Sequence, residues 1–252
     1  MLGRPGILRR TVLAASLAAS VFPCVAGAGP WSVGAGGGWT SAYHPYPNPD
    51  PDPSFGGYDG PYTSTWLVNA SVARSLDPAL QLRAEVSGFA HEAEGNTFYG
   101  IYRAAGHPLT YSVSTAAYAS VHQQSRAEIL PVAIGIRVHR PFGRSGIGPY
   151  LDVLPTLFIV HWEERSSGWV DFYPDSTLSF SSQQDWTRAV AGATLGLGFQ
   201  IRGGDTWNLD YGIQWRRSAP IAHETSPAPE IPRDPSLGIN TLSLAMSIAW
   251  SP

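Results

Sequence analysis

The feature that most constrains this chain is a period-two alternation of bulky apolar residues with small or polar ones, repeated along most of its 252 residues. A period of two places alternate side chains on opposite faces of a β-strand, whereas a helix would repeat every 3.6 residues. In the clearest segment, 241–250, Leu, Met, Ile and Trp alternate with Thr, Ser and Ala. Seven further segments behave similarly, near residues 31–39, 66–73, 80–87, 130–139, 150–159, 188–200 and 207–216. The sequence therefore predicts eight strands, each with one bulky apolar face.

The connections between these segments alternate in length. Three are short, at 75–78, 140–149 and 202–206, and four are long, at 43–62, 90–126, 163–185 and 217–235. Short turns at one end and long loops at the other are typical of membrane barrels, and an even strand number allows closure. We therefore predict an all-β, eight-stranded antiparallel up-and-down transmembrane β-barrel. Residues 109–121 alternate again, which indicates either a continuation of the third and fourth strands above the membrane or a further hairpin, so ten strands are the alternative count.

The N-terminal segment predicts export. Residues 1–10 carry three Arg and no acid, residues 11–22 form a twelve-residue apolar run, and Ala26, Gly27 and Ala28 are small. This is the pattern of a cleaved secretory signal peptide over residues 1–28, followed by a barrel domain over residues 29–252. The apolar run ends at Pro23 and is shorter than the roughly 20 residues of a transmembrane helix. Because Cys24 is the one cysteine and lies in the leader, no disulfide is expected.

Tryptophans gather at the ends of the predicted strands. Indole rings favour the bilayer interface, so two girdles are expected. The predicted interface aromatics are Trp39, Trp66 and Trp215 at the long-loop end, and Trp31, Trp207 and Trp250 at the other end. Trp162 and Trp186 also fall at the long-loop end, but their parity places them inward, which predicts a bulge or a different register there. Trp169 is predicted to lie in a loop.

Several segments together resemble a known family. They are the leader, the strand ILPVAIGIRV, the strand opening GPYLDV, the glycine-alternating AGATLGLGF and the alternating last strand with Trp250. This combination is similar to the outer-membrane β-barrel domain family, in its small OmpA/OmpX type, over residues 29–252. The resemblance implies a barrel with surface loops in the outer membrane of a Gram-negative envelope. Its implied partners are outer-membrane lipid and, during biogenesis, the barrel-assembly machinery.

The inward faces of the predicted strands carry charges of both signs. Eight strands enclose only enough space for side chains, and an unpaired buried ion costs several kcal/mol. We therefore predict a paired charge network that fills the lumen and leaves no wide pore. Its expected members are Arg83, Glu85, Arg137, Asp152, Arg188, Asp210 and Arg216.

The sequence predicts no catalytic residue, no cofactor and no metal site. His161 with Glu163 and Glu164, like His91 with Glu92 and Glu94, brings imidazole and carboxylates together without the spacing of a known motif. A net charge of −3 gives no support for nucleic-acid binding. The predicted function is a structural or surface-interaction role, with an extracellular ligand at the long loops, and not an enzymatic one.

Two alternatives stay open. A lipid-modifying outer-membrane enzyme of the lipid A deacylase type would carry a His-x-Ser arrangement, but none of the seven His has Ser two residues on. A soluble periplasmic barrel of the lipocalin type would turn its apolar faces inward to hold an apolar ligand. The direction of the bulky residues discriminates between this second alternative and a membrane barrel.

Overall fold

The computed structural model of the chain describes residues 31–42, 64–101, 117–140, 146–172, 176–204, 206–221 and 238–251. The predicted signal peptide and Cys24 lie outside these ranges. The described part is all-β, with strands β1 (Trp31–Ala42), β2 (Thr65–Asp77), β3 (Leu80–Ile101), β4 (Ala117–His139), β5 (Ile147–Phe172), β6 (Ser176–Arg202), β7 (Trp207–Ser218) and β8 (Asn240–Trp250). Within these ranges no helix is long and apolar enough to cross a membrane.

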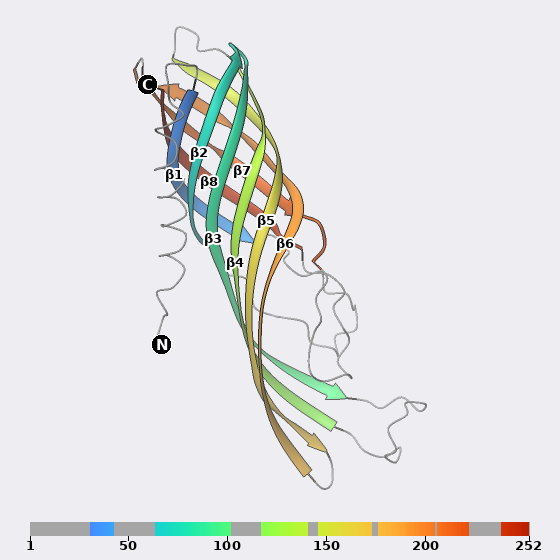
Figure 1. The fold of residues 1–252 in the computed structure, drawn as a ribbon. Coiled ribbons are helices and arrows are strands. Elements are labelled where there is room, and N and C mark those ends of the chain that lie inside the picture. The colour runs from blue at the N-terminus through green and yellow to red at the C-terminus, as the bar shows by residue number, and fades with distance from the viewer. Residues whose placement is uncertain are drawn as a thin grey trace.

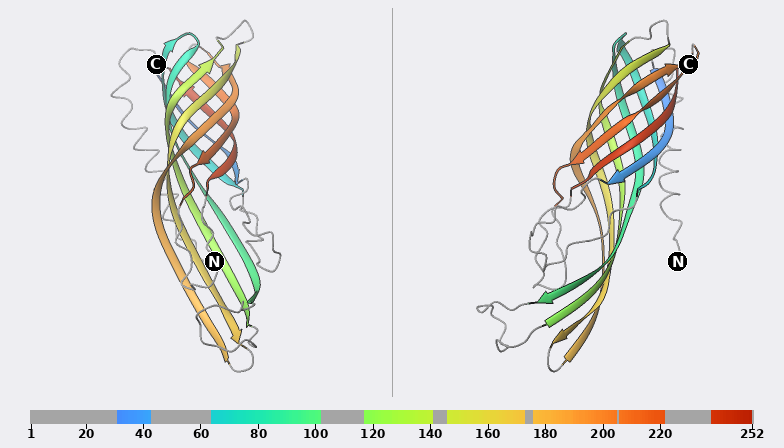
Figure 2. Two further views of the ribbon diagram at one scale, coloured as in Figure 1. Left: turned by 90° about the vertical axis from the view of Figure 1, so that its right-hand side faces the viewer. Right: turned by 180° about the vertical axis from the view of Figure 1, so that it is seen from behind.

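The eight strands form one closed barrel in sequence order (Figure 1). Every strand pairs antiparallel with its neighbours in the chain, and β1 closes the barrel against β8, where Val33 lies opposite Trp250. Figure 2 shows the closed wall from two further sides. The predicted eight-stranded antiparallel fold is confirmed. The alternative of ten strands is wrong for the described residues, because the extra alternation belongs partly to β4.

The alternation sets the two faces of the barrel wall. Along β8 the exposed and buried residues alternate without interruption, with Leu, Met, Ile and Trp outward and Thr, Ser and Ala inward. The same division holds on β7, where Ile213 and Trp215 are exposed while Gln214 and Arg216 are buried. Because a one-residue slip would reverse every side chain, this contrast fixes the register of each strand. The prediction that the bulky apolar residues face outward is confirmed.

Short turns join the strands at one end of the barrel, as predicted. Only Pro78 and Ala79 separate β2 from β3, and the Ala79 N–H donates a 2.6 Å hydrogen bond to Asp77 Oδ1. An Asp side chain that accepts from the backbone two residues on is a standard turn device. Gly146, just before β5, has a positive φ of 68°, which glycine adopts without steric cost.

At the other end, two predicted loops are mostly strand. Within 90–126, β3 and β4 continue to the pair Ile101 and Ala117, so of the two interpretations of that segment the continuation of these strands is confirmed. The prediction of a loop over 163–185 is wrong, because β5 and β6 continue to the pair Phe172 and Ser176. β2 pairs with β3 only as far as Gly88, and β7 pairs with β6 only from Gly192 onward. Strands β3–β6 therefore project beyond the barrel as a four-stranded extension (Figures 1 and 2).

Candidate functional site in the barrel interior

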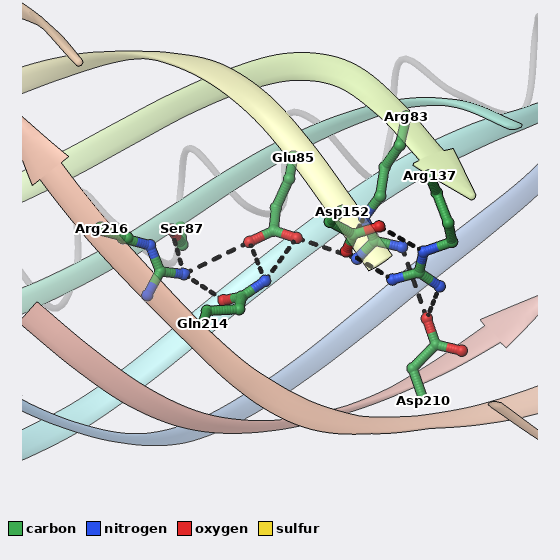
Figure 3. A network of polar contacts seen from close by, with 8 residues as sticks. All are labelled: Arg83, Glu85, Ser87, Arg137, Asp152, Asp210, Gln214 and Arg216. Carbon is green, nitrogen blue, oxygen red and sulfur yellow. Dashed lines mark hydrogen bonds and ion pairs between the residues drawn. The ribbon is translucent and has the colours of Figure 1, made fainter. Parts of the chain in front are cut away.

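Arg137 lies at the centre of a buried charge cluster in the half of the barrel near the short turns. Its Nε and Nη2 donate to Asp152 Oδ1 and Oδ2 at 2.7 and 2.9 Å, a bidentate pair, and its Nη1 donates to Asp210 Oδ2. Its guanidinium also stacks on Tyr150, 3.8 Å from the ring centroid. Asp152 and Tyr150 come from β5 and Asp210 from β7, so the cluster joins strands across the interior. Figure 3 shows Arg137 with the two carboxylates.

A second cluster surrounds Arg216 on β7. Arg216 Nη1 donates to Ser243 Oγ at 2.7 Å, and its Nη2 lies 3.5 Å from Glu85 Oε1 and also donates to Gln214 Oε1. Gln214 Nε2 in turn donates to both Glu85 oxygens, at 3.1 and 3.2 Å. The two clusters meet at Arg83, which lies 3.0 Å from Glu85 and 3.5 Å from Asp210 (Figure 3).

The formal charges of this network balance. Arg83, Arg137 and Arg216 oppose Glu85, Asp152 and Asp210, and all six side chains are almost fully buried. Buried ions are tolerated where each has partners of opposite sign and good geometry. The structure therefore brings together six of the seven charged residues that the sequence singled out.

Arg188, the seventh, lies outside the network. Its parity on β6 is inward, as predicted, but the residue is exposed, and its guanidinium lies 5.5 Å from the Trp186 ring centroid. The physical reason is its position along β6. β7 pairs with β6 only from Gly192 onward, and Arg188 lies beyond that pair, toward the extension. At Arg188 the wall is open on that side, so a charged side chain reaches solvent.

Two inward glycines make room for Tyr150. A Cβ on Gly198 would lie 2.7 Å from Tyr150 Oη and 2.3 Å from the Tyr211 carbonyl oxygen, and one on Gly212 would lie 2.4 Å from Tyr150 Oη. These contacts are closer than a real Cβ can make, so only glycine fits there while the tyrosine stays in place. The inward Gly positions therefore allow the aromatic ring that stacks on Arg137.

Above the charges, on the side of the extension, the interior is apolar. A buried cluster there comprises Leu67, Phe89, Ala127, Ile129, Phe158, Val160, Trp162, Ile221, Ile239 and Ala245. The charge network therefore occupies only part of the interior, and apolar side chains fill the rest of the described interior that the network was predicted to fill. Trp162 is 3% exposed and stacks on Trp186, with ring centroids 6.0 Å apart. Their inward parity is right and the expected bulge is absent there, since the register through Trp162 and Trp186 is continuous.

The six tryptophans expected at the interface all project from the outer face. Trp39 and Trp66 meet edge-on at the long-loop end, with centroids 5.2 Å apart, and Trp215 donates from Nε1 to Asn240 Oδ1 at 2.8 Å. At the short-turn end, Trp207 lies opposite Trp250, and Arg74 lies 5.4 Å from the ring centroid of Trp31. Trp169 belongs to β5 and not to a loop.

Between these two sets of tryptophans the outer face is apolar. At about 3.3 Å per residue and a tilt of about 40°, the outward run from Trp207 to Trp215 rises roughly 20 Å and that from Ile147 to Ile159 roughly 30 Å. These values bracket the apolar band of about 25 Å that membrane barrels carry. Directly beyond Ile159 the outward residues become polar, beginning with His161 and Glu163.

Sequence reasoning missed the neutral members of the interior network. Gln214 and Ser87 have the inward parity, but a search for charges alone leaves them out, although both contact the Arg216 guanidinium. Thr40 accepts a 2.9 Å hydrogen bond from Ser243 on β8 and extends the network to β1. Inward parity combined with hydrogen-bonding capacity is the signal that would have identified all of them.

Comparisons with known proteins find likeness only in structure. No protein-family model matches the sequence, and no curated protein matches it. Neisserial surface protein A is 12% identical, with a TM-score of 0.41, over 90% of this chain and 99% of that chain. The N-terminal β-barrel domain of Pseudomonas aeruginosa OprF is 8% identical, with a TM-score of 0.38, over 88% and 97%. The Yersinia pestis attachment invasion locus protein Ail is 10% identical, with a TM-score of 0.35, over 87% and 97%. By its own strand order and register, the chain has the fold of a closed eight-stranded antiparallel β-barrel.

Proposed function

We propose that this chain is an integral outer-membrane β-barrel protein with a structural or surface-interaction role. The observation that carries the proposal is the outward apolar face, with interface-type tryptophans at both of its ends. In hydrocarbon every backbone N–H and C=O must be paired internally, and a closed barrel satisfies this requirement without open edges. Its immediate partners are then outer-membrane lipid and, during biogenesis, the barrel-assembly machinery.

The direction of the large side chains also weighs against a soluble lipocalin-like barrel. Such a barrel would keep Leu197, Ile248 and Trp66 inside, yet these residues are exposed on the outer face. A monomer in water rarely exposes an apolar surface that surrounds the whole molecule. In the half of the barrel near the short turns, the interior holds ion pairs, which an apolar ligand of the lipocalin type would not match.

The protein should behave as a membrane barrel when it is extracted. We expect detergent to be required to release it from membranes, and the folded barrel to migrate differently on a gel before and after heating, because a closed wall resists detergent until heat opens it. Fractionation and gel migration, with and without boiling, measure both properties. Recovery in a detergent-free periplasmic fraction would contradict the proposal.

The interior should not conduct like a wide porin. Ion pairs and the Tyr150 ring occupy the half near the short turns, and the apolar cluster occupies the half near the extension. Single-channel recording in planar bilayers should therefore show no conductance of the wide-porin class. A large, stable open channel from folded wild-type protein would show that the lumen is not filled.

The four-stranded extension supports the surface-interaction part of the proposal. Strands β3–β6 continue past the polar residues that follow the apolar band, on the side of the predicted long loops. Residues held on paired strands are presented more rigidly than residues on loops of the same length. We therefore propose that the contact surface for an extracellular ligand includes this extension.

The lipid-modifying alternative gains little from the described residues. His161 Nδ1 lies 3.0 Å from Thr187 Oγ1, and this pair is not a His-x-Ser arrangement. We therefore propose a role without catalysis.

A further inference from the structure

Three potential metal ligands meet on the outer face where the apolar band ends. His161 and Glu163 are two residues apart on β5 and so share a face, and Asp185 on β6 lies directly opposite Glu163 in the register. Ile159 and Ala189, the preceding outward residues on the two strands, are apolar. The three side chains are therefore the first polar groups above the apolar band on β5 and β6.

The distances suit a single bound ion. His161 Nε2, the ring nitrogen that would bind the ion, lies 3.4 Å from Glu163 Oε1. Asp185 Oδ1 lies 3.5 Å from the other ring nitrogen, Nδ1, so the Asp185 side chain has to turn toward Nε2 to share the ion. One ligand atom from each residue falls within 4.8 Å of the others. Tetrahedral zinc, with bonds of about 2.1 Å, spaces its ligands about 3.4 Å apart. Small rotations of the two carboxylate side chains would close the remaining gap.

The group is accessible, and its imidazole is oriented by a neighbour. The side chains of His161, Glu163 and Asp185 are 29%, 41% and 56% exposed, so an ion can enter from solvent. Thr187, opposite His161 on β6, holds the ring by the 3.0 Å contact between its Oγ1 and Nδ1. A ligating His is commonly fixed by a hydrogen bond at its other ring nitrogen.

The local charges favour a cation. Glu163 and Asp185 are like charges directly across a strand pair, an arrangement that destabilises a sheet. Arg126 on β4 lies opposite Glu163 on its other side, so four carboxylates on this face, those of Glu92, Glu128, Glu163 and Asp185, surround a single arginine. Arg126, on the same outer face, pairs with Glu92 at 3.1 Å and with Glu128 at 3.0 Å. Among the described residues, the ion pairs of Glu163 and Asp185 are with His161 alone.

We propose that His161, Glu163 and Asp185 form a binding site for a divalent transition-metal ion of the Zn²⁺ type. One imidazole nitrogen and two carboxylate oxygens are suitable ligands for Zn²⁺, whereas Ca²⁺ takes six to eight oxygen ligands and would find too few here. Water completes the coordination on the open side. Sequence reasoning rejected a metal site at His161 because the third ligand comes from the neighbouring strand and not from a local motif.

Calorimetric titration of ZnCl2 into folded, detergent-solubilised full-length protein without a histidine tag tests the site. We expect one strong binding event in the wild type, weakened at least about tenfold by His161→Ala or by Asp185→Asn. Glu92→Gln is the matched control, because it removes a carboxylate from the same face outside the triad, and it should leave Zn²⁺ affinity unchanged. CaCl2 should bind much more weakly than ZnCl2.

The gel shift on heating shows that each variant is folded before it is titrated. The proposal is overturned if folded His161→Ala and Asp185→Asn bind Zn²⁺ as tightly as the wild type. It is also overturned if Glu92→Gln loses as much affinity as they do, or if Ca²⁺ binds as tightly as Zn²⁺, since either result describes a diffuse acidic surface. None of these results bears on the membrane proposal, which extraction and gel migration test separately.

Discussion

Replacing Asp152 by Asn should lower the free energy of unfolding of the barrel by about 3–5 kcal/mol, the cost of breaking a buried ion pair by removing one partner. Asp152 is fully buried, forms the bidentate pair with Arg137 and lies 3.9 Å from Arg83. Its neutralisation leaves three buried arginines against two carboxylates. Urea unfolding in lipid vesicles, followed by gel migration or tryptophan fluorescence, measures the loss.

A second variant separates the charge effect from a simple loss of packing. Arg137→Gln combined with Asp152→Asn restores the balance at two charges of each sign, so the double variant should be more stable than Asp152→Asn alone. Arg188→Gln, on the exposed residue outside the network, should change the free energy of unfolding by no more than about 0.5 kcal/mol. A double variant that loses the sum of two single losses would show that the network is not coupled.

Replacing Leu197 by Arg should destabilise the barrel in lipid by about 2–4 kcal/mol, the cost of a cation near the bilayer midplane on a lipid-facing strand. Leu197 is 65% exposed in the middle of the outward apolar run of β6. At an equally exposed position in water the same change costs little, because surface substitutions usually stay within about 0.5 kcal/mol. The free energy of unfolding in vesicles therefore reports directly whether this face meets hydrocarbon.

The matched control lies on the same face of the same strand. Gln183 is exposed on the extension, beyond the end of the apolar band, so Gln183→Arg should leave stability in lipid nearly unchanged. Equal losses from the two arginines would mean that the substitution disturbs β6 itself. No loss from either would place Leu197 in water and remove the main support for the membrane proposal.

Strand number and facing could be predicted from the sequence because one face of every strand is bulky and apolar and the other is not. Leu242 and Ser243 show this contrast, and a one-residue error would exchange their environments. Where the two faces of a strand no longer differ in hydrophobicity, the sequence no longer predicts the strand. Residues 163–185 carry six Ser, three Asp, two Glu and two Gln, with polar residues on both faces, so the sequence shows no clear period-two hydrophobic signal there and predicts a loop.

Contacts between strands were harder to predict than faces. The alternation of faces placed Arg83, Arg137 and Asp152 inside the barrel. Which of these charges form ion pairs depends on the register between strands and on the position of each residue along the barrel axis. Position along the barrel also explains why Arg188 is exposed. Arg188 has the same parity as Gly192 but lies beyond the last β6–β7 pair, on the side of the extension. The same limitation hid the triad of His161, Glu163 and Asp185, because opposition across two strands becomes visible only when the pairing is known.

The pairing of β1 with β8 has a consequence for how the molecule forms. Val33 and Trp250 belong to β1 and β8, the first and last strands of the barrel, so this ladder cannot assemble until β8 has been synthesised, and contacts so remote in sequence form slowly. Until then β1 and β8 each present an unsatisfied ladder that invites mispairing with other molecules. The risk of misfolding is therefore greatest at the β1–β8 pairing, which forms last. A folding catalyst would help most by keeping the edges of β1 and β8 from pairing with other molecules until the barrel closes.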